Sequence, residues 1–182
     1  MTVAAELEVR LERGSDHRQV RQVVLSAFEA DPVVADLVEA LRESSGWRPA
    51  LSLVAEEDGS VVGHVMATRG WLDAPARLVE VLVLSPLSVT SARQGQGIGT
   101  RLVRQLLADA AGTAPAIFLE GAPGYYGRFG FEAAGPAGFR RPSLRIPEPA
   151  FQVRTFPGYE PWMTGTLVYP EAFWALDCVG LR

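Results

Sequence analysis

The apolar positions of this chain recur with two periods, and each period predicts one kind of element. Leu7, Val9 and Leu11 alternate with charged residues, as on a strand with one buried face. Val20 and Val24 lie four residues apart in a segment that opens with good helix-capping residues, as on an amphipathic helix. The two periods predict strands over 6–12, 51–55, 60–68, 78–89, 116–120, 151–156 and 165–169, and helices over 16–29, 32–43 and 97–111, with one or two helical turns in 121–131 and a short helix after Pro170.

The segments between these elements indicate how the strands are connected. Residues 56–59, Glu-Glu-Asp-Gly, are a hairpin signal, whereas residues 135–149 are rich in proline and glycine. The strand over 78–89 contains Pro86, which cannot donate to a sheet ladder and therefore predicts a bulge or an edge. Because neither a repeat nor a linker interrupts the chain, we expect residues 1–182 to form a single domain. Its expected class is α/β (α+β), with a mostly antiparallel twisted sheet flanked by helices.

Composition narrows the classes of function. Hydrophobic residues make up 48% of the 182 and charged residues 21%, as in globular proteins, and no apolar run approaches the roughly 20 residues that cross a bilayer. The net charge of −4 argues against nucleic-acid binding, which needs a dense cationic surface. The single cysteine, Cys178, can form neither a disulfide framework nor a cysteine zinc cluster, and we expect no metal. A cytoplasmic protein that binds neither membrane nor nucleic acid is the expectation.

The basic residues exclude one further class of protein. All 17 are arginine, so the chain cannot be a P-loop NTPase, whose phosphate loop uses a lysine. Asparagine is absent as well. Since lysine and asparagine have AT-rich codons, we infer a GC-rich and bacterial genome.

A glycine-rich segment precedes the helix over 97–111 and reads Arg93-Gln94-Gly95-Gln96-Gly97-Ile98-Gly99-Thr100. Glycines at alternate positions tolerate positive φ and let a ligand come close to the backbone. Backbone N–H groups at a helix N-terminus favour an anion, so a diphosphate is the expected ligand. The G-x-G-x-G spacing differs from the G-x-G-x-x-G of dinucleotide-binding folds. Tight packing of a strand–helix turn is the alternative explanation for the glycines.

The pattern Gln94-x-x-Gly97-x-Gly99 resembles the Q/R-x-x-G-x-G/A pyrophosphate loop of the GNAT superfamily of N-acetyltransferases. The resemblance implies a splayed central strand whose exposed backbone pairs with the pantetheine arm of coenzyme A, and the position of Pro86 agrees with this. It implies acetyl-CoA as co-substrate. The implied cofactor-binding residues are Leu87, Ser88, Val89, Arg93, Gln94, Gly95, Gln96, Gly97, Ile98, Gly99, Thr100 and Phe129.

A tyrosine motif follows the strand over 116–120. Tyr126-x-x-x-Gly130-Phe131 resembles the GNAT Y-x-x-x-G-F element, whose tyrosine lies near the coenzyme sulfur and protonates the departing thiolate. Such a donor suits the chemistry, because amine attack on a thioester expels an anion. The double tyrosine is similar to the YhbS-like bacterial branch, and the resemblance spans residues 7–173. Gly121 stands where many members have an asparagine.

The residue that deprotonates the attacking amine has no motif of its own. Glu80, on the strand that leads to the splay, is the first candidate for the general base, and Glu120 is the second. His64 and a water relay stay open, since the ordinary pKa of histidine suits a base. Aromatic residues that could line an apolar acceptor pocket are Trp47, Trp71, Tyr159, Trp162, Tyr169 and Trp174.

The resemblance implies an N-acetyltransferase that moves an acetyl group directly from acetyl-CoA to a primary amine of a small molecule or peptide, as a monomer or homodimer. Because Cys178 lies outside both motifs, we expect no acetyl-cysteine intermediate. The alternative is a non-catalytic acyl-CoA-binding or sensing module of the same fold. A protein that uses the loop for ATP or NAD is the third hypothesis.

Overall fold

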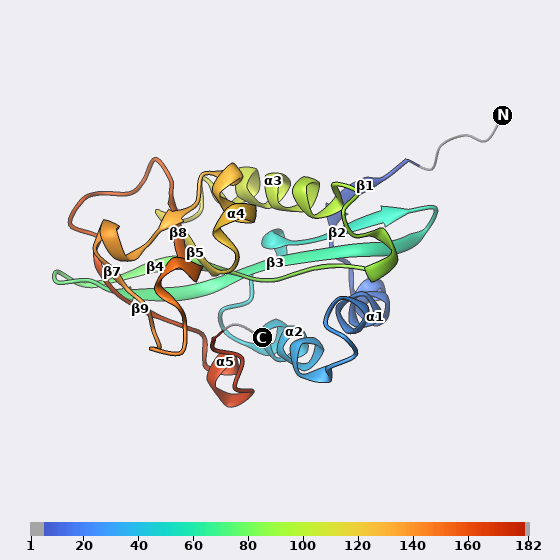
Figure 1. The fold of residues 1–182 in the computed structure, drawn as a ribbon, viewed down its shortest axis with the longest axis horizontal. Helices are drawn as coiled ribbons and strands as arrows, with labels where there is room; N and C mark the ends of the chain where they lie inside the picture. The colour runs from blue at the N-terminus through green and yellow to red at the C-terminus, as the bar shows by residue number, and fades with distance from the viewer. Residues whose placement is uncertain (1–5, 181–182) are drawn as a thin grey trace.

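The computed structural model describes residues 6–180, and within them nine strands form one sheet with helices on both faces (Figure 1). The strands are β1 (Glu8–Leu11), β2 (Ser52–Glu57), β3 (Ser60–Asp73), β4 (Leu78–Val89), β5 (Ala116–Glu120), β6 (Glu132–Ala133), β7 (Phe139–Arg140), β8 (Phe151–Thr155) and β9 (Gly165–Val168). Their order is β1-β2-β3-β4-β5-β8-β6, and β9 pairs with both β3 and β7. Only the β4–β5 and β7–β9 ladders are parallel in this part of the chain. The predicted α/β (α+β) class with a mostly antiparallel sheet is confirmed.

Five helices cover the two faces of the sheet in the described residues: α1 (His17–Ala27), α2 (Pro32–Glu43), α3 (Ile98–Ala110), α4 (Pro123–Tyr126) and α5 (Glu171–Ala175). In Figure 1, α3 lies on one face, and α1, α2 and α5 lie on the other. The apolar stripes of α1 and α2 pack on one core, and the stripe of α3 packs on a second core across the sheet. No helix within 6–180 is both long enough and apolar enough to cross a membrane.

Strand β3 is longer than its alternation predicts. The sequence indicated an end near Thr68, whereas the strand continues to Asp73. Its first half pairs with β2, and its last residues, Trp71 to Asp73, pair with β9. The extension therefore depends on a ladder formed with a segment almost 100 residues away, which local periodicity does not report.

Strand β4 parts from β5 halfway along its length. The two strands pair only at Leu82–Ile117 and Val83–Phe118, and β4 then continues beside β3 to Val89. The β3–β4 register also shifts here, so that Ser85 and Pro86 lie opposite Met66, and the Ser85–Pro86 peptide is cis. The bulge expected at Pro86 and the splayed central strand are both confirmed. Two cavities lie at the opening between β4 and β5.

Candidate active site

The glycine-rich loop connects the end of β4 to α3. Gly95 and Gly97 have φ angles of 73° and 83°, which favour glycine, and Gly97 is the N-cap of α3. A Cβ at either position would meet no atom within 4 Å, so tight packing does not explain these two glycines. The side-chain amide of Gln94 donates to the carbonyl of Val89 at 3.0 Å and holds the loop against the strand end. The loop thus presents open backbone at the start of a 13-residue helix, where N–H groups have no intrahelical acceptor.

A cavity of about 450 Å³ lies over this loop. Nine of the twelve residues predicted to bind the cofactor line it: Leu87, Val89, Arg93, Gln94, Gly95, Gly97, Ile98, Gly99 and Thr100. The other three do not. Ser88 is buried opposite His64 in the β3–β4 ladder, Gln96 accepts a hydrogen bond from Arg93, and Phe129 packs beneath Tyr125.

Two further residues of the loop cavity, Tyr125 and Arg128, were missed by the sequence analysis. The Arg128 guanidinium lies over the Tyr125 ring at 4.1 Å, and a Cβ on Gly99 would lie 2.7 Å from the tyrosine hydroxyl. Arg93 is held by Glu57 and Gln96, so much of its charge is already paired. Arg128 is therefore the cation of this cavity that is engaged by an aromatic ring rather than by a carboxylate. The signal for it was its place within the tyrosine motif.

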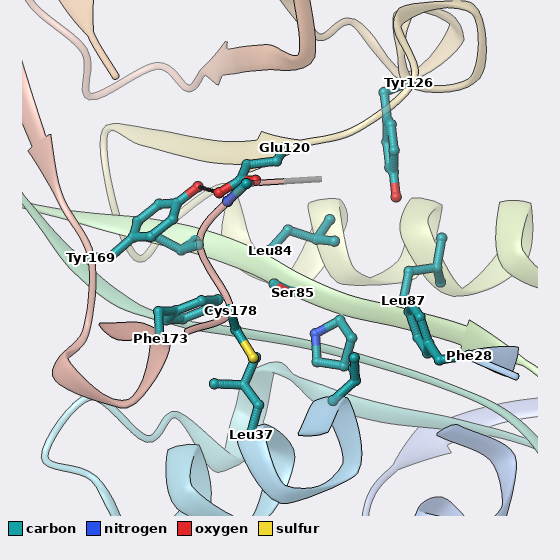
Figure 2. Close-up of a pocket in the computed structure, with 14 residues that line it drawn as sticks. Phe28, Leu37, Leu84, Ser85, Leu87, Glu120, Tyr126, Tyr169, Phe173 and Cys178 are labelled. Carbon is teal, nitrogen blue, oxygen red and sulfur yellow. Dashed lines mark hydrogen bonds between the residues drawn. The ribbon is translucent and has the colours of Figure 1, made fainter. Parts of the chain in front are cut away.

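A second cavity, of about 220 Å³, lies at the splay between β4 and β5 (Figure 2). Its walls come from α1, α2, β4, the end of β5, α4 and the C-terminal segment. Leu87 lines both cavities, so they adjoin at the end of β4. We call the first the loop cavity and the second the splay cavity.

Tyr126 brings its hydroxyl into the splay cavity from α4, as Figure 2 shows. Burial raises the pKa of its phenol above the ordinary value, with a smaller contribution from Tyr125, so the group holds its proton at neutral pH. Gly121 makes this position possible, because a Cβ there would lie 2.4 Å from Cε2 of Tyr126. The glycine that replaces the common asparagine of the family therefore has a structural reason.

Glu120 supplies a carboxylate at the opposite side of the splay cavity. The Tyr169 hydroxyl donates to its Oε1 at 2.8 Å, and the Gly180 N–H donates to its Oε2 at 3.0 Å. Burial raises the pKa of Glu120 above its ordinary value, against the lowering effect of these two hydrogen bonds and of Arg145. A half-buried carboxyl of raised pKa, fixed by two donors, is suited to accept a proton.

The other two candidate bases lie outside the splay cavity. Glu80 lies near the start of β4, opposite Trp71 of β3, where its side chain is 42% exposed and forms an ion pair with Arg48 at 2.6 Å. His64 is fully buried, hydrogen-bonded to Ser52 at 3.1 Å and 3.4 Å from Glu12. Burial lowers the pKa of its imidazole, which keeps it neutral inside this polar cluster. Neither side chain lines the cavity.

Of the six aromatic residues predicted to line an acceptor pocket, the splay cavity contains Tyr169. The aromatic walls come instead from Phe28, at the end of α1, and Phe173, on α5. These two phenylalanines are 145 positions apart in a chain of 182 residues, and no local pattern joins them. Cys178 also lines the cavity, next to Gly180.

A splayed sheet, a glycine loop before a helix, and a cavity with a tyrosine on one side and a half-buried carboxylate on the other are features expected of an acetyltransferase. Residues 21–131, more than half of the chain, match the acetyltransferase (GNAT) family, and the chain belongs to this family.

Relatives within the family cover most of the chain. It is 39% identical over 140 residues to YjhQ, an uncharacterized N-acetyltransferase of Escherichia coli K12, a match that covers 74% of each chain. It is 33% identical over 171 residues to the N-acetyltransferase YhbS of the same strain, covering 91% of this chain and 97% of YhbS.

Two solved structures extend the likeness to the whole fold. The crystal structure of E. coli YhbS in complex with CoA has a TM-score of 0.81 at 29% identity, covering 95% of this chain and 94% of YhbS. A GNAT family acetyltransferase of Brucella melitensis in complex with acetyl-CoA has a TM-score of 0.74 at 34% identity, covering 92% of this chain and 98% of that one. The chain is thus a GNAT N-acetyltransferase with a YhbS-like structure.

Proposed function

We propose that this protein transfers an acetyl group directly from acetyl-CoA to a primary amine, with Tyr126 as the general acid and Glu120 as the general base. The observation that carries the proposal is the pair of adjoining cavities. The loop cavity offers a helix N-terminus and the splay cavity offers the two proton-transfer groups, and Leu87 belongs to both.

The loop cavity fits a diphosphate on its own chemistry. The open backbone at Gly95 and Gly97 and the positive end of α3 favour an anion, and Arg128 adds a charge at the rim. The YhbS and Brucella relatives were crystallised with CoA and acetyl-CoA, which supports acetyl-CoA as the co-substrate here. Residues 87–89, on the unpaired edge of β4, are proposed to hold the pantetheine arm through their backbone.

Two residues of the splay cavity carry the proton transfers of the proposed reaction. The amine nitrogen attacks the thioester carbonyl, so that a C–N bond forms and the C–S bond breaks. Glu120 accepts the proton that the amine loses, and the Tyr126 hydroxyl donates a proton to the departing thiolate. Burial raises the pKa of Tyr126, so the general acid holds its proton at neutral pH. Burial also raises the pKa of Glu120, while its two donors stabilise the ionised form that accepts the proton.

Glu120 replaces Glu80 as the preferred base because of where the two strands part. Glu80 lies before the short β4–β5 ladder, opposite Trp71 of β3, and its exposed carboxylate forms an ion pair with Arg48. Glu120 is the last residue of β5, at the open end of the splay. A base must come within hydrogen-bond reach of the amine, and this requirement favours the residue inside the cavity.

The test measures thiol release from acetyl-CoA over a panel of primary amines, with Tyr126→Phe compared with wild type. Loss of a general acid lowers kcat by about 10²- to 10⁴-fold. Tyr159→Phe is the matched control, because Tyr159 packs on Phe139 and lines neither cavity. Unchanged turnover in Tyr126→Phe would refute the acid role.

A sensing module that binds acetyl-CoA without transfer is the second candidate function. Calorimetry separates the two: tight acetyl-CoA binding with no turnover of any amine favours the sensor. The well-positioned pair of Tyr126 and Glu120 favours the enzyme, because a module that only binds the coenzyme has no need of a carboxylate in the adjoining cavity.

A further inference from the structure

The walls of the splay cavity are more apolar than those of the loop cavity. More than half of its surface is apolar, with Phe28, Val34, Leu37 and Phe173 among the lining residues together with the β4 segment 83–87. Figure 2 shows Phe28, Leu37 and Phe173 around the same space as the Glu120 carboxylate. A ligand of this cavity therefore meets an apolar surface for its body and one carboxylate, Glu120, at the edge.

We propose that the acceptor is a compact amine with a single positive charge, an apolar or aromatic body and no carboxylate. This inference rests on the proposed function and names the substrate class for it. The ammonium group would pair with Glu120 and lose its first proton through that carboxylate to solvent; the neutral amine then attacks, and Glu120 accepts the second proton as in the proposed reaction. The body of the acceptor would pack against Phe28 and Phe173. Edge and face contacts between aromatic rings favour an aromatic body over an aliphatic one of equal size.

The charges around the cavity support this selection. Among the described residues, no arginine and no histidine lines it; its titratable side chains are Glu120, Tyr126, Tyr169 and Cys178. Arg145 influences Glu120 from outside the lining and is itself paired with Asp177. A carboxylate on the acceptor would be desolvated against carbon and repelled by Glu120.

Size limits the acceptor as well. The cavity measures about 220 Å³, below the roughly 300–1,000 Å³ of sites for drug-sized ligands. Part of this space must also admit the acetyl group near Leu87 and Tyr126. An amine with one ring and a short side chain fits the remainder, whereas a large polycation does not.

A matched pair of substrates tests the inference. 2-Phenylethylamine and phenylalanine differ only in the carboxylate, so the ratio of their kcat/KM values isolates its effect. Two like charges about 6 Å apart at an effective dielectric of about 20 correspond to a preference on the order of 100-fold for the decarboxylated amine. Equal or better use of phenylalanine would overturn the inference and leave acetyl transfer itself intact.

A variant pair locates the selection in the cavity. Phe28→Arg places a cation in its wall and should reduce the preference for 2-phenylethylamine at least about tenfold, because the guanidinium would pair with the acceptor carboxylate. Trp174→Arg is the control, since Trp174 is exposed and outside the lining, and it should keep the wild-type ratio. Thermal unfolding of both variants checks that they fold. An unchanged ratio in folded Phe28→Arg contradicts the assignment.

A binding measurement separates failure of this inference from failure of the proposed function. Phenylethyl-trimethylammonium keeps the charge and the body but cannot be acetylated. Its binding is measured by calorimetry with CoA present. Binding that is weakened about tenfold or more in Glu120→Gln supports the proposed acceptor class. If the compound binds in this way but no amine is turned over, the acceptor class stands and the transfer proposal fails. Absence of binding while 2-phenylethylamine is acetylated no better than phenylalanine overturns the inference alone.

Discussion

Glu120→Gln is the substitution that tests the proposed base most directly, because it removes the charge and the basicity while keeping the shape of the side chain. The Gln carbonyl can still accept the hydrogen bond from Tyr169, now at 2.8 Å from Oε1. The Gly180 N–H, 3.0 Å from Oε2, would face the amide nitrogen and lose its acceptor. The substitution thus perturbs one hydrogen bond and one proton acceptor, and little else.

The expected magnitudes separate chemistry from folding. Loss of a positioned general base lowers kcat by about 10²- to 10⁴-fold, or about 3–5 kcal/mol in the activation barrier. The lost hydrogen bond costs on the order of 1 kcal/mol of stability, and removal of a carboxylate whose pKa is raised by burial offsets part of it. The variant should therefore stay folded at assay temperature while turnover falls.

The pH profile gives the sharpest measurement. In the proposed mechanism the carboxylate form of Glu120 is the active one. Burial raises the pKa of Glu120 above the ordinary value, so wild-type kcat/KM should fall as the pH drops through that raised pKa. Glu120→Gln should lose this acid limb altogether. Thiol release from acetyl-CoA, measured from pH 5 to 9 with 2-phenylethylamine, reports both quantities.

Glu80→Gln is the matched control, since it makes the same chemical change on the neighbouring strand. Its exposed ion pair with Arg48 is worth little, and its carboxylate is remote from the splay cavity. We expect turnover within about twofold of wild type and an unchanged acid limb. A large loss of turnover in Glu80→Gln, together with near-normal turnover in Glu120→Gln, would refute the reasoning and identify Glu80 as the base.

Two further predictions address the surroundings of the proposed pair. Tyr169→Phe removes a hydrogen bond that lowers the pKa of Glu120, so the pKa of Glu120 should rise. The acid limb of the pH profile should then move to higher pH, with activity largely recovered at alkaline pH. An unshifted limb would contradict an effect of the Tyr169 hydrogen bond on Glu120. Gly121→Ala places a Cβ 2.4 Å from the Tyr126 ring and should lower kcat at least about tenfold through displacement of the hydroxyl, with little change in the KM for acetyl-CoA. Steady-state kinetics on both substrates distinguishes that result from a general loss of binding.

The parts of the site that the sequence predicts well are those encoded in one short stretch. The anion-binding character of the loop over 93–100 follows from a few consecutive residues, and Tyr126 was singled out by the resemblance of residues 126–131 to the GNAT tyrosine motif. Pro86 likewise predicted the bulge in β4, because a proline has no N–H to donate and is found in sheets mainly at bulges and edges.

The splay cavity could not be predicted in the same way. Its walls join Phe28, Leu37 and Phe173, whose apolar character is equally consistent with ordinary core packing. The apolar runs likewise indicate that Glu80 and Glu120 lie on strands, but not which end of each strand is open. That depends on the length over which β4 and β5 pair, a long-range property of the sheet.

The parting of β4 from β5 has a consequence for the protein when it is empty. In the described chain the β5-facing edge of β4 beyond Val83 has no strand partner, so its backbone groups must be met by water or by a ligand. A pantetheine arm laid along that edge would complete the sheet, and at a hundred times its Kd the coenzyme would add about 2.7 kcal/mol to the free energy of unfolding. The survival of the enzyme against heat and proteolysis would then rise and fall with the cell's supply of acetyl-CoA.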